Sequence, residues 1–297
     1  MAINSDNAKL LFYAKKLGVS FVHSLMLGRL NLSVKKDDLQ KYIAFFQNHS
    51  EELENIKFRD YAEPLFELLG ATKIDSIDYS DYENATITHD LNTPIPFNLK
   101  MKYSAVIDGG TLEHIFNFPM AIKNCMEALQ IGGHFISFTP ANNTLGHGFY
   151  QFSPELYYRI FSEQNGFKVK FLAIYLNDGG NWYSVADPEI VKSRIILKNS
   201  DPTHLIVIAE KIEEKEIFSV MPQQSDYNYA WNLFEADKLN NKSDQDSRLL
   251  YLYKRALPLR LRLFLRKYFD YFFKQPKVIP GLGTVNPRYF KKIDIGI

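Results

Sequence analysis

The sequence of 297 residues has little of several features that define large protein classes. Cys125 is its only cysteine, which excludes an intramolecular disulfide and a zinc site built from several cysteines. No stretch approaches the ~18 uninterrupted apolar residues of a membrane-spanning helix, and the N-terminus has no apolar core of signal-peptide length. Because 35 Lys and Arg balance 34 Asp and Glu, the net charge of +1 gives no general attraction to nucleic acid. We therefore expect a cytoplasmic protein with no transmembrane segment and no nucleic-acid partner.

The sequence does contain a large supply of core-forming residues. With 46% hydrophobic and 14% aromatic residues, it can bury enough apolar surface to offset its ordering entropy. From Ser20 to Ile212, short β-like apolar runs alternate with helix-length periodic segments, a rhythm typical of a parallel sheet covered on both faces by helices. The expected strands are Phe21–Leu27, Lys73–Asp78, Ala85–His89, Ser104–Asp108, His134–Thr139, Lys168–Tyr175 and His204–Ala209. The predicted fold class is α/β, with a seven-stranded, mostly parallel sheet.

Helical periodicity and turn residues locate the connecting elements. Crossover helices are expected at Phe58–Leu69 and Met120–Leu129. Gly132–Gly133 follows the second helix, where a left-handed helix stop is expected. Ser153–Pro154–Glu155 has the residue types of a helix start, and this helix is expected to run to about Gly166.

The composition changes along the chain and predicts two regions. Residues 1–212 should form the main domain, with a helical insertion at about 31–57 that contains a helix around Asp37–Gln47. Residues 213–297 should form a mainly helical, basic and aromatic extension. Within it, Ser247–Lys274 interleaves Arg and Lys with Leu, Tyr and Phe, which is typical of basic amphipathic helices. We expect this segment to pack on the main domain, and peripheral contact with an anionic membrane is the alternative.

Polar residues follow the expected strands at the end where open α/β sheets bind their ligands. Asp78 ends the second strand, Asp90 follows the third, and Asp108 ends the fourth. An acidic residue at the tip of the second strand can accept hydrogen bonds from the hydroxyls of a ribose. We therefore predict that Asp78, with Tyr79 beside it, binds the ribose of a nucleoside cofactor.

Titratable and neutral polar side chains lie in the loops after the fourth and fifth strands. Glu113 and His114 follow the fourth strand, and His147 lies between two glycines that allow close approach to a ligand. We predict His147 or His114 as a general base. The residues predicted to bind a polar substrate are Glu113, Asn142, Asn143, Tyr150 and Gln151. Glu113 and His114 could instead hold a divalent cation, but only part of a ligand set is visible, so no metal site is predicted.

Two runs, Tyr103–Phe116 and Ala128–Pro140, resemble the central half of class I S-adenosylmethionine-dependent methyltransferases, especially the group called type 11. In that family a strand ending in an acidic residue is followed by a Leu-Glu-His turn, a helix, a Gly-Gly turn and a strand ending near proline. The resemblance covers roughly Ser20–Ile212. It implies a Rossmann-like fold and S-adenosyl-L-methionine as the cofactor.

Carried over residue by residue, the resemblance also implies roles for single residues of the cofactor site. The implied cofactor-binding residues are Gly28 near the methionine part, Asp78 on the ribose, Asp90 and Leu91 beside the adenine, and Asp108 with Gly109 in the methyl-transfer pocket. The first loop departs from the family, because it reads Leu27-Gly28-Arg29-Leu30-Asn31 where the family has three glycines. The missing glycines remove the usual close approach of the backbone to the cofactor.

Together these observations predict an S-adenosylmethionine-dependent methyltransferase that acts on a small polar acceptor, such as a sugar or a surface-glycan precursor in polysaccharide biosynthesis. The altered first loop motivates a second hypothesis, a non-catalytic protein of the same fold that binds a partner or a glycan intermediate. A nucleotide-sugar enzyme with another cofactor is a third.

Overall fold

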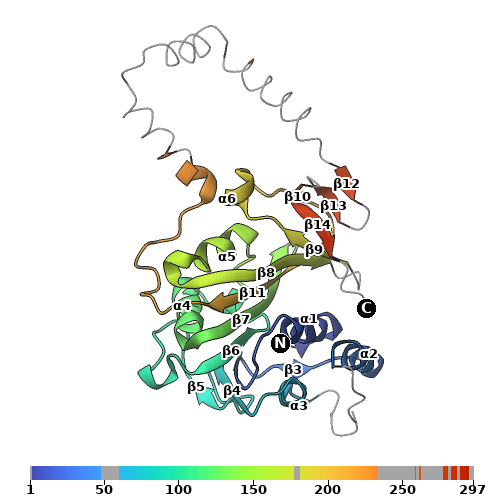
Figure 1. The fold of residues 1–297 in the computed structure, drawn as a ribbon, viewed down its shortest axis with the longest axis vertical. Helices are drawn as coiled ribbons and strands as arrows, with labels where there is room; N and C mark the ends of the chain where they lie inside the picture. Colours follow the sequence, from blue (N-terminus) through green and yellow to red (C-terminus); the bar gives the residue numbers. More distant parts are fainter. Residues whose placement is uncertain are drawn as a thin grey trace. The chain divides into compact units, whose positions relative to one another are not determined.

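The computed structural model describes residues 2–47, 60–176, 181–229, 231, 232, 258, 261, 277–279, 282–285 and 288–293, and Figure 1 shows their fold. The chain divides into two compact units. One consists of residues 1–184, 201–222 and 292–297, and the other of residues 185–200 and 223–291. No helix in the described ranges has the length and apolar character needed to cross a membrane.

A nine-stranded sheet carries the predicted site residues (Figure 1). Its order is β14-β9-β8-β11-β7-β6-β2-β4-β5. The strands in this order are Phe290–Ile293, Trp182–Val185, Phe167–Leu176, Thr203–Lys211, Leu129–Asn142, Tyr103–Asp108, His23–Leu27, Lys73–Asp78 and Ile87–Thr88. Seven of them lie where the sequence predicts strands, whereas β9 and β14, at one edge, are additional.

The order of the parallel strands is that of a Rossmann-like sheet. β2, β4, β5, β6 and β7 pair in parallel. Counted in chain order, these five strands are arranged 3-2-1-4-5, which is the order of the first five strands of the Rossmann fold. β11 then lies antiparallel between β7 and β8. The predicted Rossmann-like α/β class is confirmed, and its topological switch point lies between β2 and β6.

Alternating side chains on the central strands bury both faces of the sheet. On β2, Met26 packs in the core that also contains Leu11 of α1 (Ser5–Lys16), while Leu25 and Leu27 face the side of Cys125 in α4 (Phe118–Ala128). This alternation follows from the two-residue period of a strand. α2 (Lys36–Gln47) and α3 (Glu63–Leu68) share the face of α1, and α5 (Pro154–Ile160) covers Phe135 of β7 on the other face.

The predicted crossover elements are largely present. α4 confirms the second crossover helix, but Gly132, at φ 78°, lies inside β7 rather than at the helix end, because the chain enters β7 directly at Leu129. The Ser153 side chain accepts a hydrogen bond from Leu156 N and begins α5, as predicted. α5 is followed by the short helix η4 (Glu163–Asn165), which ends at left-handed Gly166. Of the first expected crossover helix, α3 is present, and residues 58 and 59 lie outside the described residues.

The helix predicted within the insertion is present as α2 and packs against α1. Phe12 of α1 lies 6.2 Å from Tyr42 and 6.1 Å from Phe46 of α2, measured between ring centroids. α1 itself is a helix that the sequence analysis does not predict. It begins where Asn4 accepts a hydrogen bond from Asn7 N. The short strands β1 (Ala2–Ile3) and β3 (Asn31–Leu32) pair in parallel beside these helices.

The second unit contains α6 (Pro188–Val191) and a three-stranded sheet. This sheet has the order β10-β13-β12, with β10 at Leu197–Lys198, β13 at Gly283–Val285 and β12 at Lys277–Ile279. β12 and β13 lie in residues 213–297, which the sequence predicts as mainly helical, whereas β10 lies in the region predicted as the main domain. The basic segment Ser247–Lys274 lies outside the described residues except for Pro258 and Leu261, so its packing and its membrane contact stay predictions.

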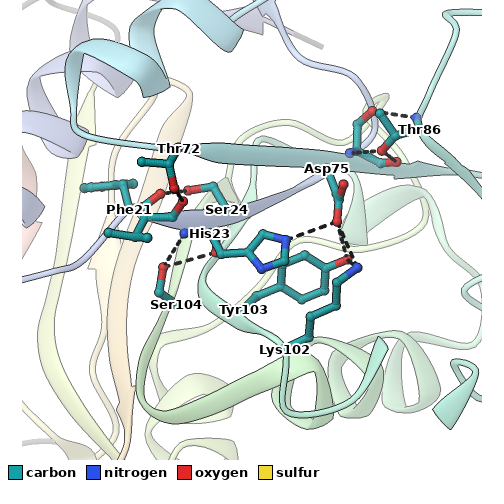
Figure 2. A network of polar contacts seen from close by, with 11 residues as sticks. Phe21, His23, Ser24, Thr72, Asp75, Thr86, Lys102, Tyr103 and Ser104 are labelled. Atoms are coloured by element: carbon teal, nitrogen blue, oxygen red, sulfur yellow. Dashed lines mark hydrogen bonds and ion pairs between the residues drawn. The ribbon is translucent and has the colours of Figure 1, made fainter. Parts of the chain in front are cut away.

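A polar network joins three strands near their amino ends, away from the predicted site (Figure 2). Asp75 of β4 accepts hydrogen bonds from Lys102 Nζ at 3.1 Å and Tyr103 Oη at 2.9 Å, and its Oδ2 lies 3.2 Å from His23 Nε2. Burial alone raises the pKa of Asp75, but hydrogen bonds from these three neighbours outweigh it, so its pKa lies below the ordinary value. The network ties β2, β4 and β6 together.

Candidate functional site

In the loop after β2, both the backbone and the basic side chain have partners within the protein. Gly28 is left-handed at φ 71°, and its N–H donates to the Ile77 carbonyl at 2.8 Å. Arg29 Nε donates to Glu63 Oε1 at 2.7 Å, and its guanidinium lies 3.8 Å from the ring centroid of Tyr61. The predicted position of Gly28 at the carboxyl edge is therefore observed, but its N–H already has a partner.

A buried leucine packs between the loops after β2 and β6, at the switch point. Leu30 is fully buried, and a Cβ added to Gly109 would lie 2.7 Å from its Cδ2. Thr111 Oγ1 also donates to the Leu27 carbonyl at 2.6 Å, which links the loop after β6 to the end of β2. Gly109 thus serves close packing between the two loops, and Leu30 and Thr111 are neighbours that sequence reasoning missed.

Asp78 ends β4 with a half-buried carboxylate. Within the described residues this carboxylate has no hydrogen bond or ion pair, while its backbone carbonyl accepts from His89 N at 2.8 Å. Tyr79, the next residue, is 75% exposed. Asp78 therefore has free acceptor capacity at the carboxyl end of β4, the strand next to β2, as its predicted role in binding a ribose requires.

Asp90 and Leu91 have internal partners. Asp90 Oδ1 accepts from Asn92 N at 2.9 Å and from Asn92 Nδ2 at 2.7 Å, and these bonds hold the pKa of Asp90 below its ordinary value. Leu91 is buried and lines a small apolar cavity with Leu25, Leu27 and Ile77. Asp90 thus stabilises its own turn, and Leu91 provides an apolar wall next to it.

Asp108, at the end of β6, is completely buried. Its Oδ1 accepts from the backbone N–H groups of Gly110, Thr111 and Leu112, and its Oδ2 accepts from Ser137 Oγ at 2.8 Å. Burial raises the pKa of this carboxyl, and the hydrogen bonds act in the opposite direction. Asp108 thus fixes the loop that follows β6, and its predicted place in the methyl-transfer pocket stays a prediction.

That loop brings Glu113 and His114 together with His147. Glu113 and His114 belong to the short helix η3 (Leu112–His114), and His147 comes from the loop after β7. Glu113 Oε1 lies 3.4 Å from His147 Nε2, and the two imidazole centroids lie 4.9 Å apart. One ligand atom from each of the three residues lies within 4.8 Å of the others. Both predicted bases and Glu113 therefore form one cluster.

The cluster combines a buried acid with two exposed imidazoles. The Glu113 side chain is only 1% exposed, and its Oε2 has no hydrogen-bond partner among the described residues. Burial, and then the neighbouring Asp108, raise the pKa of Glu113 to about 8. Burial and then His147 lower the pKa of His114. Near neutral pH these shifts favour a protonated Glu113 and a neutral His114.

The loop after β7 is held against Glu113 by its backbone. Phe149 N donates to the Glu113 carbonyl at 2.7 Å, and a Cβ at Gly148 would lie 2.7 Å from the same oxygen. Gly148 also has a left-handed φ of 71°, so only glycine fits there without strain. This close approach explains the second of the two glycines around His147.

The predicted substrate-binding side chains of this loop have partners inside the protein. Tyr150 Oη donates to the Phe116 carbonyl at 2.6 Å, and Gln151 Oε1 accepts from Thr144 N and Oγ1. Asn143 Nδ2 donates to the Asp201 carbonyl at 2.9 Å, and half-buried Asn142 ends β7. Their observed role is to shape the loop that presents His147, and their contact with a substrate stays a prediction.

Comparison with known proteins gives remote structural similarities. No family model and no curated protein matches the chain. The MccD protein is similar with 12% identity and a TM-score of 0.40, over 69% of this chain and 97% of that one. The N-methyltransferase NodS from Bradyrhizobium japonicum, solved with S-adenosyl-L-homocysteine, has 11% identity and a TM-score of 0.36, over 70% and 87%. A branched-chain polyamine synthase from Thermus thermophilus has 14% identity and a TM-score of 0.36, over 74% and 61%.

Proposed function

We propose that this protein is an S-adenosylmethionine-dependent methyltransferase that acts on a small polar acceptor, such as a sugar or a surface-glycan precursor. One arrangement carries the proposal. The free carboxylate of Asp78 follows β4, and the Glu113–His114–His147 cluster follows β6 and β7, on the opposite side of the switch point in the same parallel sheet. Open α/β sheets bind nucleoside ligands at this edge.

The β4 side of the edge fits a nucleoside. Asp78 can accept hydrogen bonds from two ribose hydroxyls, since no other group among the described residues uses its carboxylate. Exposed Tyr79 and buried Leu91 supply aromatic and apolar surface nearby. Asp78, Tyr79 and Leu91 are thus the residues that would hold the nucleoside part of the cofactor.

The β2 side does not fit the amino-acid part of the cofactor. The Gly28 N–H is bonded to Ile77, and Leu30 fills the space next to Gly109. The first loop therefore offers no backbone cradle of the kind that three glycines provide.

The Glu113–His114–His147 cluster supports removal of a proton from the methyl acceptor. When bound, S-adenosylmethionine supplies an activated methyl group, and the protein's task is to align the acceptor and remove its proton. Exposed His147 can take a proton at Nδ1, because its Nε2 faces buried Glu113 at 3.4 Å, and this contact would orient the ring. Neutral His114 stands beside it as the second candidate base.

Leu30 favours the second candidate function, a non-catalytic protein of this fold that binds a partner or a glycan intermediate. A fully buried leucine at the switch point occupies the place where open α/β sheets receive a ligand. Such a protein would keep the loops after β6 and β7 as its binding surface and would not bind S-adenosylmethionine.

Calorimetric titration of the full chain with S-adenosylmethionine and S-adenosylhomocysteine separates the two functions. We expect binding, and we expect Asp78→Asn to weaken it about 10- to 100-fold, because charge-assisted hydrogen bonds are worth about 1.5–3 kcal/mol. Asp81→Asn, an exposed carboxylate in the same turn, is the matched control and should bind as the wild type does. Absence of binding at millimolar ligand would overturn the methyltransferase proposal, and equal affinity of a folded Asp78→Asn variant would reject Asp78 as the ribose ligand.

A further inference from the structure

We propose that Glu113, His114 and His147 form a binding site for a divalent first-row transition-metal ion, with one carboxylate and two imidazole ligands. The inference goes beyond the methyltransferase proposal and does not depend on it, because it concerns the affinity of these side chains for an ion in the absence of any cofactor.

The spacing of the three side chains suits a single ion. Ligand atoms of one ion, bound at about 2.0–2.2 Å, lie about 3.0–3.6 Å from one another. Glu113 Oε1 and His147 Nε2 already lie 3.4 Å apart, and all three ligand atoms lie within 4.8 Å of one another. The remaining separations, at most 4.8 Å, exceed this range by little more than about 1 Å, which side-chain rotation of the exposed imidazoles can close.

The Oε2 atom of Glu113 is buried without a hydrogen-bond partner in the described part of the chain. The side chain is 99% buried, and its Oε1 is directed at His147. A buried polar group without a partner destabilises the folded state. A cation between Glu113 and the two imidazoles would give this carboxyl group a partner, and this accounts for an otherwise unexplained buried acid.

The backbone holds the ligands in place before any ion binds. Two N–H groups of the loop after β7, from Phe149 and Tyr150, donate to the Glu113 carbonyl, and His147 N donates to Thr144 O at 2.9 Å. Gly148 lets the loop approach Glu113 more closely than any side chain would permit. The loop that carries His147 is therefore fixed to the helical turn that carries the other two ligands, so little ordering accompanies metal binding.

The donor set indicates the class of ion. Two imidazoles and one carboxylate suit Zn²⁺, Mn²⁺, Co²⁺ or Fe²⁺, whereas Mg²⁺ and Ca²⁺ prefer oxygen ligands throughout. Three protein ligands leave coordination positions for water or for an oxygen of a bound molecule. Because both imidazoles are exposed, those positions face solvent.

The test uses the full chain after treatment with a chelator and dialysis, without S-adenosylmethionine. Titration with Co²⁺, followed by visible absorption, and with Zn²⁺, followed by calorimetry, should show one ion per chain with a micromolar or tighter Kd. Zn²⁺ should also raise Tm, because it binds the folded state. His147→Ala and Glu113→Gln should each weaken binding at least about tenfold, as loss of a metal ligand does.

His89→Ala is the matched control, since His89 lies in a different loop and should leave the affinity unchanged. His147 is exposed, so His147→Ala should fold, which circular dichroism would verify. Wild-type protein that binds no stoichiometric Co²⁺ or Zn²⁺ at ~100 μM, or His147→Ala that binds as the wild type does, would overturn the site. Neither result bears on binding of S-adenosylmethionine, which the titration in the preceding section measures separately.

Discussion

Asp75 provides a quantitative test of how the sheet is held together at its amino ends. Its carboxylate accepts hydrogen bonds from Lys102 and Tyr103 at the start of β6 and lies within hydrogen-bond distance of His23 at the start of β2 (Figure 2). The side chain is 13% exposed. Asp75→Asn preserves the shape of the side chain and removes its charge.

We expect Asp75→Asn to lower the free energy of unfolding by about 2–3 kcal/mol at pH 7. Hydrogen bonds to a charged group contribute about 1.5–3 kcal/mol each, but Lys102 is 28% exposed and an asparagine oxygen still accepts one or two of the bonds. The expected loss is therefore close to the value of one such bond rather than of three.

The dependence on pH has a definite sign. Because the folded state lowers the pKa of Asp75, the unfolded state binds a proton more readily. The stabilisation is then present in full above the unfolded pKa of about 3.9 and is lost as the pH falls through the lower folded pKa. The difference between wild type and Asp75→Asn should stay constant from pH 7 to pH 5 and shrink below about pH 4.

Urea unfolding followed by far-UV circular dichroism at pH 7, 5, 4 and 3 measures this difference. Asp81→Asn, which removes an exposed carboxylate, should change the free energy of unfolding by less than about 0.5 kcal/mol at every pH. A loss below about 0.5 kcal/mol for Asp75→Asn at pH 7, or a loss that persists unchanged at pH 3, would refute the reasoning.

Two further substitutions test features of the core. Lys211 is fully buried, and its Nζ donates to the carbonyls of Met126 and Leu129. Lys211→Met should therefore lower the free energy of unfolding in urea by about 2–5 kcal/mol. Lys170→Met, which removes a partly exposed ion pair with Glu210, is the control and should lower it by less than about 1 kcal/mol. Leu30→Ala should lower the free energy of unfolding by about 2–5 kcal/mol. It should also raise the affinity for S-adenosylhomocysteine in calorimetry, because it opens the space next to Gly109. Unchanged or weaker binding would show that Leu30 does not occupy the ligand's place.

The central sheet could be predicted because its strands have clear local patterns of apolar residues in the sequence. β6 and β11 are short, almost wholly buried apolar runs between turn residues, and such runs indicate interior strands of an α/β sheet. β9 and β14 are four residues each and mix polar with apolar side chains, so their pattern differs little from that of a loop. α1 is not predicted although Asn4 supplies an N-cap, because its buried residues, among them Leu10, Leu11 and Phe12, form a nearly continuous run rather than a helical stripe.

The site could be predicted in its residue types but only partly in its arrangement. The Leu-Glu-His turn and the Gly-His-Gly loop located Glu113, His114 and His147, which the fold brings together. The sequence could not reveal that the Asp108 carboxylate accepts hydrogen bonds from four donors, because three of these donors are backbone N–H groups of its own loop. It also could not reveal that Leu30 packs on Gly109, since that contact joins loops almost eighty residues apart.

The two edges of the nine-stranded sheet affect whether the sheets of two molecules can pair edge to edge. β5 offers only the two residues Ile87 and Thr88 for pairing, and β14 carries Lys291 and Lys292. Short edge strands and lysines both discourage a second chain from extending a sheet. Growth of this sheet from molecule to molecule is therefore disfavoured at either edge.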